Sequence, residues 1–190
     1  ARAGCTALFD VSPMVGSVPM SALERIGGLA PIWSLNEREA GLLADRLELR
    51  VEAGDHAGVC EALSGRLGTV LVRAGEQGSW FADRGAAAHT PSIPVTPVDS
   101  NGAGDAHSGV LAAALAHGTD LATALRWANV AGALTTTRFG PAPCPRRAHT
   151  RTLAGDARRT RRDWTRARSC WRGWRAEPCP CSPWSGCPPG

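Results

Sequence analysis

The sequence predicts an α/β domain with a mostly parallel sheet and helices on both faces. Short apolar runs alternate with segments whose apolar residues recur at helical spacing, and this alternation is typical of that fold class. Asn36 and Gly75 each follow a predicted strand, at the edge of the sheet where such folds bind ligands. The 190 residues suffice for one domain core, alone or with a tail.

The first half of the chain contains most of the predicted strands. Apolar runs next to Gly, Pro or Ser predict strands, and amphipathic spacing predicts helices. Gly27 and Gly28 end the first helix, and Asn36 is the expected cap of the second. In chain order we expect a strand at 6–11, a helix at 19–27, a strand at 31–35, helices at 37–49 and 55–63, and strands at 69–72 and 79–82.

The second half begins with a proline-rich segment and continues with two helices. Prolines at every third position, Pro91 to Pro97, exclude a helix or a central strand, so residues 86–98 are expected to form an extended edge or connector. Helices are expected at 103–116 and 121–136. Both contain clusters of Ala and Gly, which allow close packing between them.

The stretch Asp-Ser-Asn-Gly-Ala-Gly-Asp at residues 99–105 carries the strongest chemical signal. A Gly-Ala-Gly turn that enters a helix presents backbone N–H groups near the positive end of the helix dipole, where anions bind. Asp105 places a carboxylate beside this anion site, where it could accept the proton of an attacking hydroxyl. The alternative is a loop with Asp105 as an N-cap.

This stretch resembles the second signature of the ribokinase-like (PfkB) carbohydrate kinases, Asp-Thr-x-Gly-Ala-Gly-Asp, with Ser100 in place of Thr. Three further segments match that family in order and at about its spacing. They are Asn-Glu-Arg-Glu at 36–39, the strand and Gly-x-x-Gly turn at 69–78, and the helix and loop at 126–140. The resemblance implies a Rossmann-like three-layer sandwich of ribokinase type, of which residues 1–143 would be the carboxyl-terminal, nucleotide-binding half.

The resemblance implies that the protein transfers the γ-phosphoryl group of ATP, with Mg²⁺, to a hydroxyl of a sugar or nucleoside. Asp105 would be the catalytic base, beside the N–H groups of Gly102, Ala103 and Gly104. Asn36 and Glu39 would lie near Mg²⁺ and the phosphates. The remaining nucleotide-binding residues would be Arg73, Gly75, Gly78 and Asn129. Plainer interpretations are a helix cap for Asn36, a surface charge for Glu39 and a hairpin turn for the two glycines.

The resemblance also implies a site for a monovalent cation, K⁺. Asp99 would bind the cation together with backbone carbonyls, and its plainer interpretation is a solvated carboxylate. The carbonyls would come from Asn101, Thr135, Arg138 and Gly140. A further family ligand falls at Cys144, and a thiol is a poor ligand for a hard cation. His107, which follows the base closely, is interpreted as a packing or substrate-shaping residue and not as an acid or base.

Charge divides the chain into two unlike parts. Residues 1–140 hold 10 Arg and 14 acidic residues, whereas 141–190 hold 11 Arg and three acidic residues, and the chain has no Lys. Residues 154–190 contain none of Leu, Ile, Val, Met and Phe, so they cannot build an apolar core. We expect residues 144–190 to be a disordered or frameshifted tail. The alternatives are a basic, Trp-bearing arm for nucleic acid, and a metal cluster at Cys179, Cys181 and Cys187, whose spacing is not a known zinc pattern.

Other sequence features bear on the cellular location of the protein and on whether the chain is active. No apolar run is long enough to span a membrane and no secretory signal is recognisable, so we expect a cytoplasmic protein with Cys5 and Cys60 reduced. The family's sugar-binding Gly-Gly motif and β lid are not found. An inactive fragment that keeps nucleotide binding, a non-catalytic binding protein and a nucleic-acid binder therefore stay open as alternatives, and a homodimer of the full-length protein is a further expectation.

Overall fold

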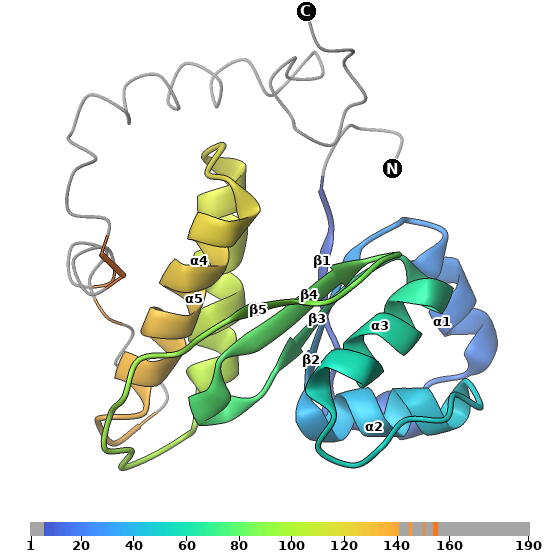
Figure 1. Ribbon diagram of the computed structural model, residues 1–190, viewed down its shortest axis with the longest axis horizontal. Helices are drawn as coiled ribbons and strands as arrows, with labels where there is room; N and C mark the ends of the chain where they lie inside the picture. Colours follow the sequence, from blue (N-terminus) through green and yellow to red (C-terminus); the bar gives the residue numbers. More distant parts are fainter. Residues whose placement is uncertain (1–5, 141–144, 146–149, 151–153, 156–190) are drawn as a thin grey trace, which may run out of the picture.

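A five-stranded mixed sheet organises the computed structural model, which describes residues 6–140, 145, 150, 154 and 155. The strands lie side by side in chain order (Figure 1). They are β1 (Leu8–Asp10), β2 (Ile32–Asn36), β3 (Thr69–Arg73), β4 (Ser79–Asp83) and β5 (Ala88–Thr90). The first three are parallel, whereas β4 pairs antiparallel with both β3 and β5.

The sheet is mixed, whereas a mostly parallel sheet was expected, and the difference lies in the two short connections to β4. A crossover between parallel strands needs a dozen or more residues. Residues 74–78 join β3 to β4, and residues 84–87 join β4 to β5, so both connections allow only hairpins. The short turn after β3 contains a 3₁₀ segment, η2 (Gly75–Gln77), closed by a hydrogen bond from Ala74 N–H to the Gly78 carbonyl (2.8 Å). The expected edge within residues 86–98 is present as β5.

The helices follow the predicted order. They are α1 (Met20–Gly27), α2 (Glu37–Arg46), α3 (His56–Leu67), α4 (Ala103–Ala116) and α5 (Leu121–Thr135), with a 3₁₀ segment η1 (Pro13–Ser17) before α1. Helix α2 ends earlier than expected, because Glu48 takes a positive φ of 56° just after its end. Helix α3 extends beyond the expected bound to Leu67, and its C-cap Gly68 has a φ of 91°, which suits glycine.

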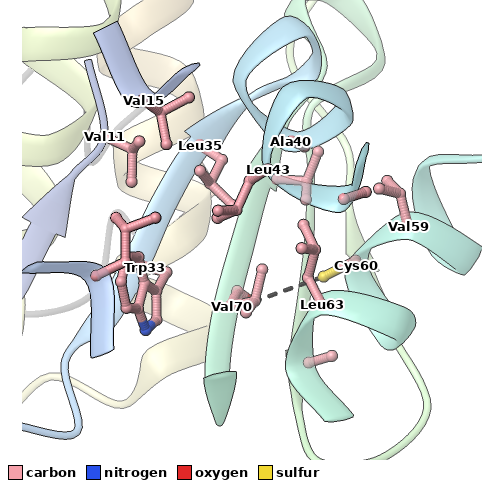
Figure 2. Packing of buried hydrophobic residues seen from close by; sticks show 14 residues of the cluster. Val11, Val15, Trp33, Leu35, Ala40, Leu43, Val59, Cys60, Leu63 and Val70 are labelled. Carbon is pink, nitrogen blue, oxygen red and sulfur yellow. Dashed lines mark hydrogen bonds between the residues drawn. The ribbon is translucent and has the colours of Figure 1, made fainter. Parts of the chain in front are cut away.

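Helices cover both faces of the sheet, as predicted, and form two apolar cores (Figure 1). Alternate residues of β2 enter different cores: Trp33 and Leu35 pack with α2 and α3 (Figure 2), whereas Ile32 packs with α4 and α5. A Cβ at Gly132 would lie 3.4 Å from the Ala103 carbonyl oxygen, so α4 and α5 approach closely, as the small residues predicted. The result is a three-layer α/β fold.

In the part of the chain that the structure describes, no helix combines the length and apolar character needed to cross a membrane. The predicted tail, including Cys144 and the cysteines at 179, 181 and 187, lies outside the described residues apart from 145, 150, 154 and 155.

Candidate active site

The first turn of α4 forms one wall of the candidate site. Gly102 is the N-cap, with a left-handed φ of 77°, and the Ala103 N–H donates to the Ser100 carbonyl (3.2 Å). Asp105 is the third residue of the helix and its side chain is exposed. Asp105 is therefore not the N-cap, and its carboxylate is open to solvent beside the positive end of the helix dipole.

Arg73, the last residue of β3, brings a positive charge to this turn. A Cβ built on Gly104 would lie only 2.8 Å from Nη1 of Arg73, so the guanidinium lies directly against the glycine backbone. Any side chain at position 104 would require the guanidinium to move. Glycine at this position therefore has a structural reason, and the turn combines helix N–H groups with an Arg side chain, both of which favour anions.

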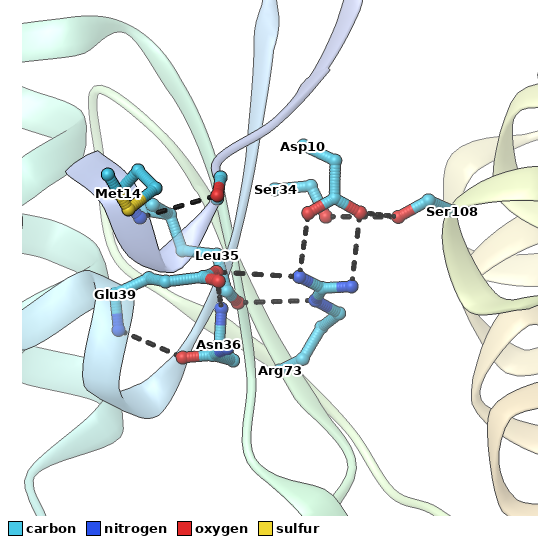
Figure 3. A network of polar contacts seen from close by, with 9 residues as sticks. Asp10, Met14, Ser34, Leu35, Asn36, Glu39, Arg73 and Ser108 are labelled. Atoms are coloured by element: carbon cyan, nitrogen blue, oxygen red, sulfur yellow. Dashed lines mark hydrogen bonds and ion pairs between the residues drawn. The ribbon is translucent and has the colours of Figure 1, made fainter. Parts of the chain in front are cut away.

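Arg73 is itself held by a polar network at the carboxyl ends of β1, β2 and β3 (Figure 3). Its Nη2 donates to Oδ1 of Asp10 (2.9 Å), its Nη1 to Oδ2 (3.2 Å) and its Nε to the Leu35 carbonyl (3.4 Å). Ser108 of α4 donates to Asp10, and its hydroxyl lies 3.4 Å from that of Ser34.

Sequence reasoning missed three members of this network: Asp10, Ser34 and Ser108. The available signal for Asp10 was its position near the end of the strand predicted at 6–11, much as Asn36 directly follows the strand predicted at 31–35. Ser108 lies three residues after Asp105 and hence on the same side of the helix. Neither signal identifies a contact with Arg73, which is 63 residues from Asp10 in the chain.

Asn36 and Glu39 form a capping box at the start of α2. The Asn36 side chain accepts from the Glu39 N–H (2.9 Å), and Oε2 of Glu39 accepts from the Asn36 N–H (2.8 Å). Glu39 is 3% exposed, so it is not a surface charge, and burial raises the pKa of its carboxyl, opposed by the Asn36 N–H and by Arg73. Its Oε2 lies 3.7 Å from Nη2 of Arg73. The structure therefore brings Asn36, Glu39 and Arg73 together.

Asp99 connects the segment before α4 to the loop after α5. Its carboxylate accepts from the N–H groups of Asn101 (2.9 Å) and Gly140 (3.0 Å), and these two hydrogen bonds lower the pKa of the carboxyl. Thr135 is buried, with its hydroxyl donating to the Ala131 carbonyl, and Arg138 is exposed. The structure thus joins three of the predicted cation-site residues, Asp99, Asn101 and Gly140.

Asn129 and His107 form a buried pair between α4 and α5. The Asn129 amide donates to the carbonyls of Thr90 (2.8 Å) and Pro91 (3.3 Å), and its oxygen lies 3.0 Å from Nε2 of His107. Burial, together with the charge of Arg73, lowers the pKa of His107 to about 3. His107 is therefore neutral, which fits its interpretation as a packing residue. The Asn129 side chain is thus engaged in hydrogen bonds within the fold, whereas the family resemblance implies that it contacts the nucleotide.

The two glycines of the turn after β3 have different surroundings. Gly78 is buried with a φ of 93°, and a Cβ there would lie 2.2 Å from the Thr90 carbonyl oxygen. Gly75 is exposed, with a φ of 51° and open space within the described structure where a Cβ would be. The hairpin interpretation thus accounts for Gly78. Gly75 lies at the same end of the sheet as Arg73, because it follows β3.

No group of three or more His, Cys, Asp and Glu side chains able to hold a metal ion occurs among the described residues. A cation at this end of the molecule would thus depend on one or two carboxylates, backbone carbonyls, water and the ligand itself. Mg²⁺ accepts such an arrangement, since it usually keeps several waters and takes few protein carboxylates.

Comparisons with known proteins agree with the family resemblance of the sequence motifs. A family model described as pfkB family carbohydrate kinase matches residues 2–147. The uncharacterized sugar kinase YegV of Escherichia coli is 33% identical over 124 residues, which are 65% of this chain and 38% of that protein.

Two solved structures share the fold. A Burkholderia thailandensis nucleoside kinase in complex with inosine is 26% identical, with a TM-score of 0.68 over 83% of this chain and 49% of that one. A putative ribokinase II from E. coli, in complex with ATP and Mg²⁺, is 29% identical, with a TM-score of 0.64 over 80% of this chain and 49% of that one. The chain therefore spans half or less of the length of these proteins.

Proposed function

Because the chain belongs to the PfkB family of carbohydrate kinases, we propose that it forms the nucleotide-binding half of an ATP-dependent kinase that phosphorylates a hydroxyl of a sugar or nucleoside. One observation carries the proposal: the Arg73 guanidinium lies against Gly104 in the first turn of α4, two positions after the left-handed N-cap and beside the exposed Asp105. Helix N–H groups and a guanidinium at one place suit the phosphates of a nucleotide.

The proposed reaction uses few groups of the protein. A carboxylate oxygen of Asp105 accepts the proton of the acceptor hydroxyl as that oxygen attacks the γ-phosphorus of ATP. The bond from the γ-phosphorus to the β–γ bridging oxygen breaks, and ADP leaves. The N–H groups of Gly102, Gly104 and Asp105 and the Arg73 guanidinium stabilise negative charge on the transferred group, so positioning and electrostatics supply most of the rate.

The remaining site residues are proposed to bind ions and nucleotide. Glu39, with Asn36, would hold Mg²⁺ through water, and the bound ion would neutralise charge on the phosphates. Asp99 with the carbonyls of the 101 and 135–140 segments would hold K⁺. Arg73 and the turn at 75–78 would contact the nucleotide. Asn129 would act by holding α5 against the Thr90–Pro91 segment, which shapes the nucleotide side of the site.

The first test measures ATP binding and turnover separately. We expect the full 190-residue chain to bind ATP with Mg²⁺ in calorimetric titrations. With a panel of sugars and nucleosides, ribose and inosine included, Asp105→Asn should reduce any phosphoryl transfer by about 10²–10⁴-fold while ATP affinity stays within about threefold of wild type. Asp45→Asn, which removes an exposed carboxylate from α2, is the control. Equal turnover by the wild type and Asp105→Asn would contradict the assignment of the base.

A second candidate is nucleotide binding without phosphoryl transfer. The contact of Arg73 with the first turn of α4 supports anion binding by itself, whereas transfer also needs an acceptor hydroxyl beside Asp105. Saturable ATP binding with no turnover on any acceptor would support this second candidate. Turnover by the isolated chain would exclude it.

A further inference from the structure

We infer that Asp10 is a positioning residue that, with Ser108, fixes the Arg73 guanidinium at the first turn of α4, so that a nucleotide phosphate meets a pre-oriented charge. This inference rests on the proposed function and deepens it. It concerns two residues to which neither the motifs nor the family resemblance gives a role.

The guanidinium is fixed in both direction and plane. Asp10 ends β1 and Arg73 ends β3, so their side chains meet over the end of β2, which lies between them. Two parallel N–H···O bonds to Asp10 orient the fork, and a third bond, from Nε to the Leu35 carbonyl of β2, sets its plane. A single point contact would leave rotation about the Cδ–Nε bond of Arg73 free.

The same carboxylate is connected to α4. The Ser108 hydroxyl donates to Oδ2 of Asp10, which is the oxygen that also accepts from Nη1 of Arg73 (Figure 3). Nη1 is the atom that would lie 2.8 Å from a Cβ on Gly104. Helix α4 therefore contacts the ion pair at Ser108 and again at Gly104, and both contacts fix where the charge lies relative to the N–H groups of the first turn.

Glu39 is a second carboxylate near Arg73, so Asp10 is needed to hold the guanidinium at the first turn of α4. Oε2 of Glu39 lies 3.7 Å from Nη2 of Arg73, and Glu39 is almost fully buried. Without Asp10, the long Arg side chain would be free to turn toward Glu39 or to sample many rotamers in solvent. The Asp10 side chain is 36% exposed, so water screens its charge, and its main contribution is orientation and not neutralisation.

Pre-orientation predicts a measurable change in affinity. Binding must then order a rotamer-rich side chain, so Asp10→Ala should weaken ATP binding about three- to tenfold in the full chain. Ser108→Ala should weaken it less, because the two Arg73 bonds remain. The control Glu52→Gln, which removes an exposed carboxylate, should leave the affinity unchanged.

A double-mutant cycle with Arg73→Met tests whether Asp10 acts through Arg73. We expect Asp10→Ala to have no effect on ATP affinity in the Arg73→Met background, with all variants checked for folding by thermal unfolding. A merely structural role would lower the unfolding temperature without a change in affinity. Equal losses of affinity in both backgrounds, or tighter ATP binding by Asp10→Ala, would overturn the inference.

The outcome also separates this inference from the proposed function. If the wild-type chain shows no saturable ATP binding, the proposed function fails and the inference fails with it. If the wild-type chain binds ATP and Asp10→Ala binds it equally well, only the inference fails.

Discussion

At the scale of single residues, Arg73 lies at the centre of the candidate site. It donates to Asp10 and to the Leu35 carbonyl, lies near the buried Glu39 and touches the backbone of Gly104. The motif at 99–105 predicts an anion site from glycine and helix geometry alone. The positive side chain that completes this site comes from the end of another element, and the sequence indicates it only through the family resemblance.

Gly104→Ala tests the contact with Arg73 directly. The added Cβ must displace the guanidinium, so ATP affinity should fall about three- to tenfold, as expected when an ordered Arg is lost. Gly109→Ala in the same helix is the matched control, because a Cβ there meets nothing within 4 Å in the described structure. It should leave affinity unchanged and stabilise the fold by about 0.5–1 kcal/mol in urea unfolding. Equal affinities for the two variants would mean that the guanidinium does not contribute to binding.

The lowered pKa of His107 predicts how the free energy of unfolding depends on pH. Its folded pKa of about 3 lies below the ordinary value of 6.5, so between these values only the unfolded chain takes up a proton. The contribution to stability is therefore full above pH 6.5 and is lost as the pH falls toward 3. The free energy of unfolding should drop by about 1.6 kcal/mol between pH 6.5 and 5 on this account.

Comparison with His107→Gln isolates this effect. The Gln variant should lack that part of the pH dependence, whereas a variant of the exposed His89, His89→Gln, should keep it. Urea unfolding at pH 6.5 and 5 provides the measurement. The same slope in wild type and His107→Gln would show that another group is responsible.

At the scale of elements, the sequence predicted the helices and the parallel strands β1 to β3, but it did not determine how β4 pairs. The bounds of α4 and α5 agree with the expected 103–116 and 121–136 to within one residue, because Gly102 and Asp120 mark their starts clearly. For β4 the sequence left both directions open, with a hairpin turn as one interpretation of Gly75 and Gly78, because an apolar run looks the same in either direction. The short link 74–78 between β3 and β4 was the available clue.

The capping box of α2 connects an element to the site. Asn36→Ala removes an N-cap and should cost about 1 kcal/mol of unfolding free energy. It also removes the partner that accepts from the Glu39 N–H, so Mg²⁺-dependent ATP affinity should fall.

The N-cap of α3 offers the matched control. Asp55 accepts from the Gly58 N–H (2.8 Å) in the same manner, so Asp55→Ala should lose similar stability and keep its ATP affinity. Unfolding in urea and calorimetric ATP titration with Mg²⁺ distinguish the two. Equal ATP affinity in both variants would assign Asn36 to helix capping alone.

At the scale of the whole molecule, three layers bring distant segments to one end of the sheet. The carboxyl ends of β1, β2 and β3 supply Asp10, Asn36 and Arg73, and α4 packs its first turn against them from the far part of the chain. Sequence motifs located Asn36, Arg73 and the α4 turn. They missed Asp10 because a lone Asp near the end of a short apolar run also suits a solvated turn, and only the tertiary fold distinguishes the two.

The central claim is that the first turn of α4, with Arg73, binds the phosphates of ATP. Amide chemical shifts of the full chain, followed by NMR during titration with ATP and Mg²⁺, test this claim residue by residue. We predict saturable shifts that are largest at Gly102, Gly104, Asp105 and Arg73. Saturable shifts confined to other parts of the chain, or no shifts at these four residues, would contradict the claim.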